Sequence, residues 1–242
     1  QVSQGKRYVH VEQDSTLALD ITGHQLDYYE WFWSTSPTIR LFVPTPGVVP
    51  STASTLELSA RTSFGSPNGY VTTRVNGVTA STSCNPSGCT GTTSALTTGL
   101  NQIDLGLSPL SPGYAPSYFD WIEFGYTSML EPANDNLDVT LGTSAGRGQV
   151  VVTDQFSAVP EILNLDNPQT PVRIVNAQRA SGKVTFETGL VAGGPNRFFF
   201  VTPAQFKSPV AMTMVAPTDL RADVSAADLV IITTPQLESA LN

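Results

Sequence analysis

The sequence predicts an all-β protein made of two tandem antiparallel β-sandwiches of the jelly-roll kind, followed by the first strand of an α/β domain. Apolar and polar residues alternate with a period of two in several segments, which is typical of strands with one buried face. Turn-forming Asn, Gly and Pro residues separate these segments at short intervals. Amphipathic helical periodicity is almost absent before the final residues.

The first sandwich is expected over residues 1–131. Asn76 and Gly77 form the dipeptide that most favours a two-residue hairpin turn, so a tight hairpin is expected there. Runs rich in β-branched and aromatic residues favour strands on either side of such turns. Four alternating runs predict strands over residues 55–60, 70–75, 102–107 and 121–126.

The second sandwich is expected over residues 132–225. The polar, proline-bearing segment 131–136 interrupts the alternation and predicts a boundary between the two modules. Two prolines in segment 167–171 lack the amide hydrogen that a strand donates, so a rigid loop is predicted there. Strands are predicted over residues 137–141, 148–153, 172–175, 183–188 and 196–201.

The last segment, residues 226–242, has a different pattern. Asp228 precedes the continuous apolar run 229–232, which is typical of a strand buried on both faces of a parallel sheet. Without a sheet to enter, such a strand would be an exposed edge. We therefore expect that the natural polypeptide continues, or that this strand pairs with a neighbouring subunit.

The charge balance excludes some classes of partner. Twelve Lys and Arg against 20 Asp and Glu give a net charge of −8 at pH 7, so nucleic acid is not expected as a partner. No apolar run approaches the ~18 residues of a membrane-spanning helix, so no membrane span is expected. Ser and Thr together number 52, and a hydroxyl-rich surface of this kind is common in secreted β proteins.

Cys84 and Cys89 are the two cysteines of the chain, with a Pro- and Gly-containing turn of four residues between them. That turn brings two β-carbons within bridging reach, so a local disulfide is predicted, with a free pair as the alternative. A metal site would need further ligands, and a nucleophilic cysteine would need a nearby base. A disulfide indicates an oxidising, extracellular compartment.

Aromatic residues gather in segment 28–33 and again around residues 114–121. Exposed Trp and Tyr rings would form a platform on which sugar rings stack, whereas buried rings would belong to the core or to a domain interface. Both interpretations stay open for both groups. The six candidate platform residues are Tyr29, Trp31, Trp33, Tyr114, Tyr118 and Trp121.

Oxygen-bearing side chains cluster at the predicted boundary between the modules. They are the hard ligands that Ca²⁺ prefers, although their spacing lacks the Gly and the terminal Glu of an EF-hand loop. A structural calcium ion and a plain polar linker are the two interpretations, and no other cofactor is expected. The four candidate ligands are Asn134, Asp135, Asn136 and Asp138.

Two further groups of titratable residues are candidates for chemistry. His10, Glu12 and Asp14 share one face of an extended strand, where they would bind a metal or a polar ligand, or simply face solvent while Val9 and Val11 face the core. Asp120 and Glu123 are an odd number of positions apart, so on a regular strand they point to opposite faces. They are therefore not predicted to act as an acid–base pair.

Several short motifs, taken in chain order, resemble the region upstream of the catalytic domain in gingipain-like (clan CD) cysteine peptidases, which include the type IX secretion sortases. Each motif is short, but together they span nearly the whole chain. The resembling segments are residues 10–14, 28–33, 75–77, 99–103, 119–126, 164–171 and 228–233.

The resemblance implies a non-catalytic accessory region of a secreted bacterial peptidase, which positions or shields the protease domain that follows it. The segment from Asp228 resembles the first strand of the caspase-like catalytic fold. In this family the catalytic His and Cys lie well beyond that strand, so no residue of this chain is expected to be catalytic. The expected partner is the chain's own downstream protease domain or a neighbouring subunit.

Two other functions are compatible with the sequence. One is a carbohydrate-binding or adhesive module of the cell surface, which the aromatic groups would serve by binding polysaccharide. The other is a structural subunit of an extracellular assembly, which would use the run 229–232 for strand addition.

Overall fold

The computed structural model describes residues 1–13, 16–18, 30–32, 38–62, 71–85, 88–107, 117–142 and 145–208. Regular structure in these ranges consists of strands β1–β18 and one 3-10 turn, η1 (Pro203–Gln205), which confirms the predicted all-β class. The described ranges contain no helix long and apolar enough to cross a membrane. The predicted terminal strand at residues 228–233 lies outside the described residues.

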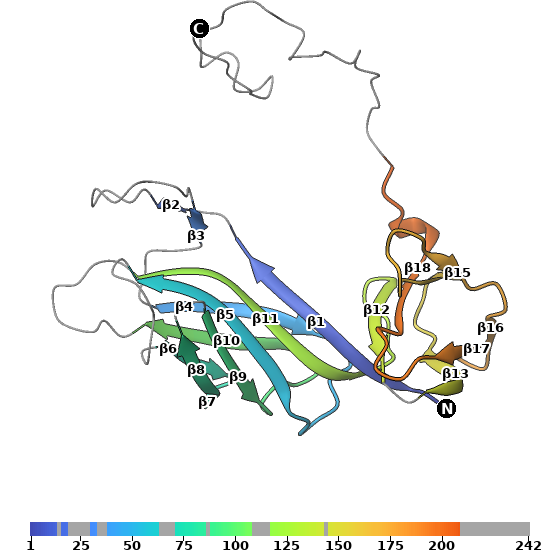
Figure 1. The fold of residues 1–242 in the computed structure, drawn as a ribbon, viewed down its shortest axis with the longest axis horizontal. Coiled ribbons are helices and arrows are strands. Elements are labelled where there is room, and N and C mark those ends of the chain that lie inside the picture. Colours follow the sequence, from blue (N-terminus) through green and yellow to red (C-terminus); the bar gives the residue numbers. More distant parts are fainter. Residues whose placement is uncertain are drawn as a thin grey trace, which may run out of the picture. The chain divides into compact units, whose positions relative to one another are not determined.

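The largest sheet has nine antiparallel strands in the order β15-β14-β18-β12-β1-β11-β5-β9-β8 (Figure 1). Their bounds are Val172–Arg173 (β15), Glu161–Asn164 (β14), Arg197–Val201 (β18), Asn136–Leu141 (β12), Gln4–Glu12 (β1), Ser117–Met129 (β11), Ser54–Thr62 (β5), Gly88–Thr93 (β9) and Ser81–Asn85 (β8).

Three smaller sheets accompany it, in the orders β4-β10-β6-β7, β13-β17-β16 and β2-β3. The four-stranded sheet consists of Thr38–Thr45 (β4), Gly99–Leu107 (β10), Val71–Val75 (β6) and Val78–Thr79 (β7). The other two sheets consist of Gly146–Thr153 (β13), Lys183–Leu190 (β17), Gln178–Ala180 (β16), Thr16–Ala18 (β2) and Glu30–Phe32 (β3).

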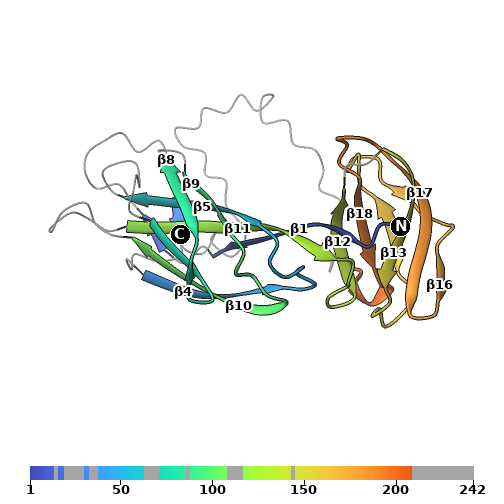
Figure 2. The same ribbon diagram turned by 90° about the horizontal axis from the view of Figure 1, so that it is seen from below.

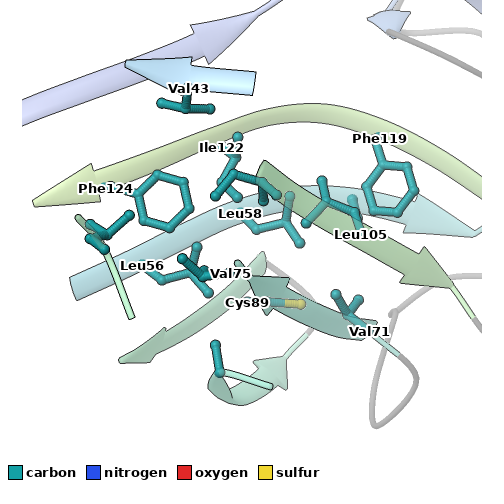
Figure 3. Close-up of a cluster of buried hydrophobic side chains, with 14 of the residues drawn as sticks. Val43, Leu56, Leu58, Val71, Val75, Cys89, Leu105, Phe119, Ile122 and Phe124 are labelled. Carbon is teal, nitrogen blue, oxygen red and sulfur yellow. The ribbon is translucent and has the colours of Figure 1, made fainter. Parts of the chain in front are cut away.

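A first hydrophobic core lies between β5, β9 and β11 of the large sheet and β4, β6 and β10 of the four-stranded sheet. Figure 2 shows these two layers, with β4 and β10 facing β5 and β11. Alternating residues point inward from both layers, as Figure 3 shows for ten of them. The largest buried side chains here are Leu56, Leu58, Ile103, Leu105, Phe119, Ile122, Phe124 and Tyr126.

A second core lies between β12, β14 and β18 of the large sheet and the three-stranded sheet. Its centre is aromatic: the Phe186 ring lies 5.5 Å from that of Phe198 and 5.9 Å from that of Phe200, centroid to centroid. Phe156 stacks on Phe200 at 6.2 Å. Aromatic contacts of this kind add to the free energy gained by burying the rings.

The N-terminal segment, residues 1–12, contributes to both cores. Val2 packs against the second core, whereas Val9 and Val11 pack against the first. Strand β1 pairs with β11 from Gln4 to Glu12 and with β12 only at Gly5 and Lys6. Residues Gln1–Phe206 form one compact unit, so the two cores share a continuous sheet and are not joined by a linker alone.

The predicted hairpin at Asn76 and Gly77 joins β6 to β7. Both residues have positive φ, 50° and 83°, as a type I′ turn requires. The Asn76 amide nitrogen donates to Oδ1 of the fully buried Asn101 at 2.7 Å. Asn101 in turn donates to Oγ1 of Thr45 and to the carbonyl of Thr97, at 2.7 and 2.8 Å.

The structure joins Cys84 and Cys89 in a disulfide between β8 and β9, with the two Cα atoms 4.0 Å apart. Cys89 is buried in the first core. The disulfide links the two outermost strands at this end of the nine-stranded sheet.

Candidate functional site

The outer face of β1 and β11 combines aromatic and titratable side chains. Because Val9 and Val11 point into the core, Tyr8, His10 and Glu12 point outward. The register places His10 opposite Glu123, and Glu12 opposite Trp121. Glu57 of β5 pairs with Glu123 from the other side. We call Tyr8, His10, Glu12, Glu57, Trp121 and Glu123 the outer aromatic face.

His10 lies at the centre of this face. Its Nε2 is 3.3 Å from Oε2 of Glu12, and its Nδ1 is 3.4 Å from Oε2 of Glu123. The ring lies 5.3 Å from the Trp121 ring, with the two planes tilted by 34°. Trp121 is half-buried, and its exposed part adjoins carboxylates that accept hydrogen bonds.

Tyr8 lies beside this group and is 63% exposed. It is opposite Gly125, and a Cβ at Gly125 would be only 2.8 Å from Cε1 of Tyr8. The ring therefore lies over bare backbone, which a larger residue at position 125 would not allow. The face offers rings for stacking and carboxylates for hydrogen bonding, a combination suited to polyhydroxylated or cationic ligands.

A β-bulge interrupts β11 directly before Trp121. The register between β11 and β5 shifts between Phe119 and Trp121, so Phe119 and Ile122 both point into the core although they are three positions apart. The sequence predicted opposite faces for Asp120 and Glu123 on a regular strand. The bulge interrupts the alternation between these two residues, so the regular alternation behind that prediction is wrong.

A second concave surface, of about 580 Å³, lies on the four-stranded sheet. Arg40, Arg74 and Asp104 come from neighbouring strands at one register position. The Arg40 Nε donates to Oδ1 of Asp104 at 2.6 Å, and Gln102 donates to Oδ2 at 2.8 Å. Phe42, 59% exposed, lies two register positions away from this group, opposite Gln102.

The carboxylate of Asp104 is held in its charged form. The hydrogen bond from Arg40, followed by that from Gln102, lowers the pKa of Asp104 below its ordinary value of 3.8. At neutral pH this surface therefore presents two guanidinium groups around one fixed carboxylate.

The six predicted platform residues have different outcomes. Trp121 is on the outer aromatic face. Trp31 and Tyr118 belong to β3 and β11, but their side chains lie outside the described residues. Tyr29, Trp33 and Tyr114 lie outside them altogether. The ligand platform therefore stays a prediction for these five residues.

The four predicted calcium ligands form hydrogen bonds within the protein and do not converge on one point. Asp135 accepts hydrogen bonds from the backbone nitrogen and the hydroxyl of Ser157, both at 2.6 Å. Asp138 binds Arg197 through both carboxylate oxygens, at 3.0 and 2.6 Å. The Asn136 amide donates to the Asn134 carbonyl. Within the described ranges, no three His, Cys, Asp or Glu side chains gather in a way that could hold a metal ion. The calcium ion stays a prediction.

Sequence reasoning missed Tyr8 and the group around Arg40 and Asp104. The alternation of β1 contained a signal for Tyr8, since it has the same parity as His10. The Arg40–Asp104 pair joins residues 64 positions apart and depends on strand order, which the alternation alone does not reveal.

No protein-family model and no curated protein matches this chain. Its fold, an all-β sandwich, is instead similar to part of a much larger solved protein. That protein is dimeric latent PorU from Porphyromonas gingivalis, with a TM-score of 0.58 and 15% identity over 86% of this chain. The chain spans about a fifth of PorU, since the match covers 21% of it. At this identity the likeness shows a common fold.

Proposed function

We propose that the chain is a non-catalytic accessory region of a secreted gingipain-like cysteine peptidase, where its β-sandwiches position or shield a protease domain. The observation that carries this proposal is the fold shared with PorU, a gingipain-like protein, over most of this chain but only 21% of that one. The motifs of the sequence analysis support the same family.

The state of the cysteines supports a non-catalytic role. The chain has two cysteines, and both are in the disulfide. A cysteine peptidase needs a free thiolate beside a base. The nucleophile of such an enzyme would therefore come from another part of the polypeptide. The disulfide is also compatible with the extracellular location that we propose.

The test is to label the natural protein with a peptide-based probe that alkylates catalytic cysteines. An antibody against residues 1–206 isolates the protein from culture medium, and the probe shows whether the same polypeptide carries a reactive thiol. We expect the label on the antibody-bound polypeptide and none on the isolated 242-residue chain. Absence of label from the natural, unprocessed protein would contradict the proposal.

A carbohydrate-binding role is the second candidate, and the exposure of Tyr8 on the same face as Trp121 and three carboxylates favours it. Substituting Trp121→Ala should weaken binding to a polysaccharide by about fivefold or more, since each stacked ring contributes on the order of 1 kcal/mol or more. Phe206→Ala, at an exposed ring far along the chain, is the control. Equal binding by both variants in a glycan array would exclude this role for the outer aromatic face.

A further inference from the structure

A narrow cleft opens where β1 and β12 separate. The two strands pair at Gly5 and Lys6, but from Arg7 onward β1 pairs with β11 alone among the described strands. The cleft between them has a volume of about 300 Å³. Lys6, Arg7 and Tyr8 line one side, and Asp138, Thr140 and Arg197 line the other.

The cleft concentrates positive charge in an acidic protein. The whole chain has 12 basic and 20 acidic residues, yet three of the basic ones line this small space. Asp138 is the acidic residue among the lining side chains, and it is bound through both oxygens to Arg197. The positive charges of Lys6 and Arg7 exceed what this one carboxylate neutralises.

Arg7 is the unusual member of this group. It lies on the inward-facing side of β1 and is only partly exposed, and burial lowers its pKa by disfavouring the charged form. Its Nη1 donates to the Glu131 carbonyl at 2.9 Å. Among the described side chains, no carboxylate lies within 4.0 Å of its guanidinium. Partly buried cations are normally paired, because removing a charge from water is costly.

We propose that this cleft binds an oxyanion, that is, the phosphate, sulfate or carboxylate group of a ligand. The Arg7 guanidinium would supply a planar pair of donors and Lys6 a point charge at the mouth of the cleft. Thr140, on the opposite wall, carries a hydroxyl, which is a donor of suitable type. An anion in this position would neutralise the positive charges of Lys6 and Arg7, because the Asp138 carboxylate is bound to Arg197.

The test is isothermal titration of the full chain with inorganic phosphate, sodium sulfate and sodium succinate at low ionic strength, where screening is weakest. We expect saturable binding of at least one anion, with a dissociation constant of about 1 mM or tighter. If phosphate or sulfate saturates the binding site and succinate does not, the cleft binds a tetrahedral oxyanion. If succinate saturates it, the cleft binds a carboxylate. Absence of binding by all three would overturn the proposal.

Variants locate the binding. Lys6→Ala removes an exposed charge and should weaken binding about tenfold, the effect of one charge-assisted hydrogen bond. Arg7→Gln should abolish it, with circular dichroism confirming that the fold is retained. Arg147→Ala, which removes an exposed arginine paired with Glu187 outside the cleft, is the control. If the control weakens binding as much as Lys6→Ala does, the anion binds elsewhere and the proposal fails.

Discussion

Among single residues, Asn101 connects two segments that the sequence singled out, 75–77 and 99–103. Its side chain is completely buried and forms hydrogen bonds that connect β10 to β4, to the Thr97 segment and to the Asn76 turn. The Thr97 backbone nitrogen also donates to its Oδ1 at 2.8 Å. Asn76 and Asn101 belong to separate motifs that the fold brings together.

Replacing Asn101 by Leu should therefore destabilise the protein by about 2–4 kcal/mol, because several buried polar groups lose their partners. Urea denaturation measures the free energy of unfolding. Gln102→Ala, next in the sequence but on the outer face of the sheet, is the matched control and should change it by no more than about 0.5 kcal/mol. Equal effects would show that the buried hydrogen bonds contribute little.

The ionised carboxylate of Asp104 makes the stability of the folded protein depend on pH. Its pKa is lower in the folded protein than its ordinary value of 3.8, so the stability it contributes is present above pH 3.8 and is lost as the pH falls through the lowered pKa. Arg40→Gln should raise the pKa of Asp104 back toward 3.8, as measured by NMR titration of the carboxyl carbon. Arg147→Gln, in a separate ion pair, should leave it unchanged. An unchanged pKa in Arg40→Gln would show that Arg40 is not its cause.

At the scale of strands, alternation was a reliable guide where one face is buried. The predicted runs 102–107 and 121–126 lie within β10 and β11, and the predicted run 137–141 lies within β12. The predicted run 172–175 contains only the two-residue β15, because its apolar residues Val172 and Val175 are exposed at the edge of the sheet. Strand order and the β-bulge at Asp120 depend on pairing between distant segments, which local patterns do not encode.

The contact between β1 and β12 depends on a glycine. A Cβ at Gly5 would meet Cγ2 of Val139 and would lie 2.8 Å from the Thr140 carbonyl oxygen. Gly5→Ala should destabilise the protein by about 1–3 kcal/mol through this overpacking. Gly189→Ala, also in a strand but with open space around the new methyl group, should be neutral within about 0.5 kcal/mol. Identical melting temperatures for the two variants would refute the close approach of β1 to β12.

At the scale of the whole molecule, the shared nine-stranded sheet makes the two cores one compact unit. The sequence predicted two modules from the polar segment 131–136, but it contained no signal that β1 would bridge them. The N-terminal strand pairs with β11 on one side and with β12 on the other, and the paired residues are 109 or more positions apart along the chain. We therefore expect the cores to unfold together.

Phe200→Ala tests this coupling, because Phe200 is fully buried in the second core. The substitution should destabilise the protein by about 3–5 kcal/mol. The fluorescence of the protein includes that of Trp121, which lies on β11 beside the first core, so it reports on that core. The fluorescence and far-ultraviolet circular dichroism transitions should shift to the same lower midpoint. A fluorescence transition that stays at the wild-type midpoint would show that the cores unfold independently.

For the candidate sites too, the sequence revealed some of the residues, whereas their contacts depend on which strands pair. Trp121 and His10 were identified as candidates from their residue type and from the alternation of faces along a strand. Their contact could not be predicted, because it depends on the register in which β1 pairs with β11. The cleft beside Arg7 forms because β1 and β12 stop pairing after Lys6, and no pattern in the sequence indicates that separation.

The proposed function makes this chain the scaffold of a larger secreted peptidase. The decisive measurement is the mass of the intact natural gene product, taken by mass spectrometry before any processing. We expect a polypeptide several tens of kilodaltons larger than these 242 residues, with further cysteine and histidine residues outside them. A natural product of this length alone would contradict it.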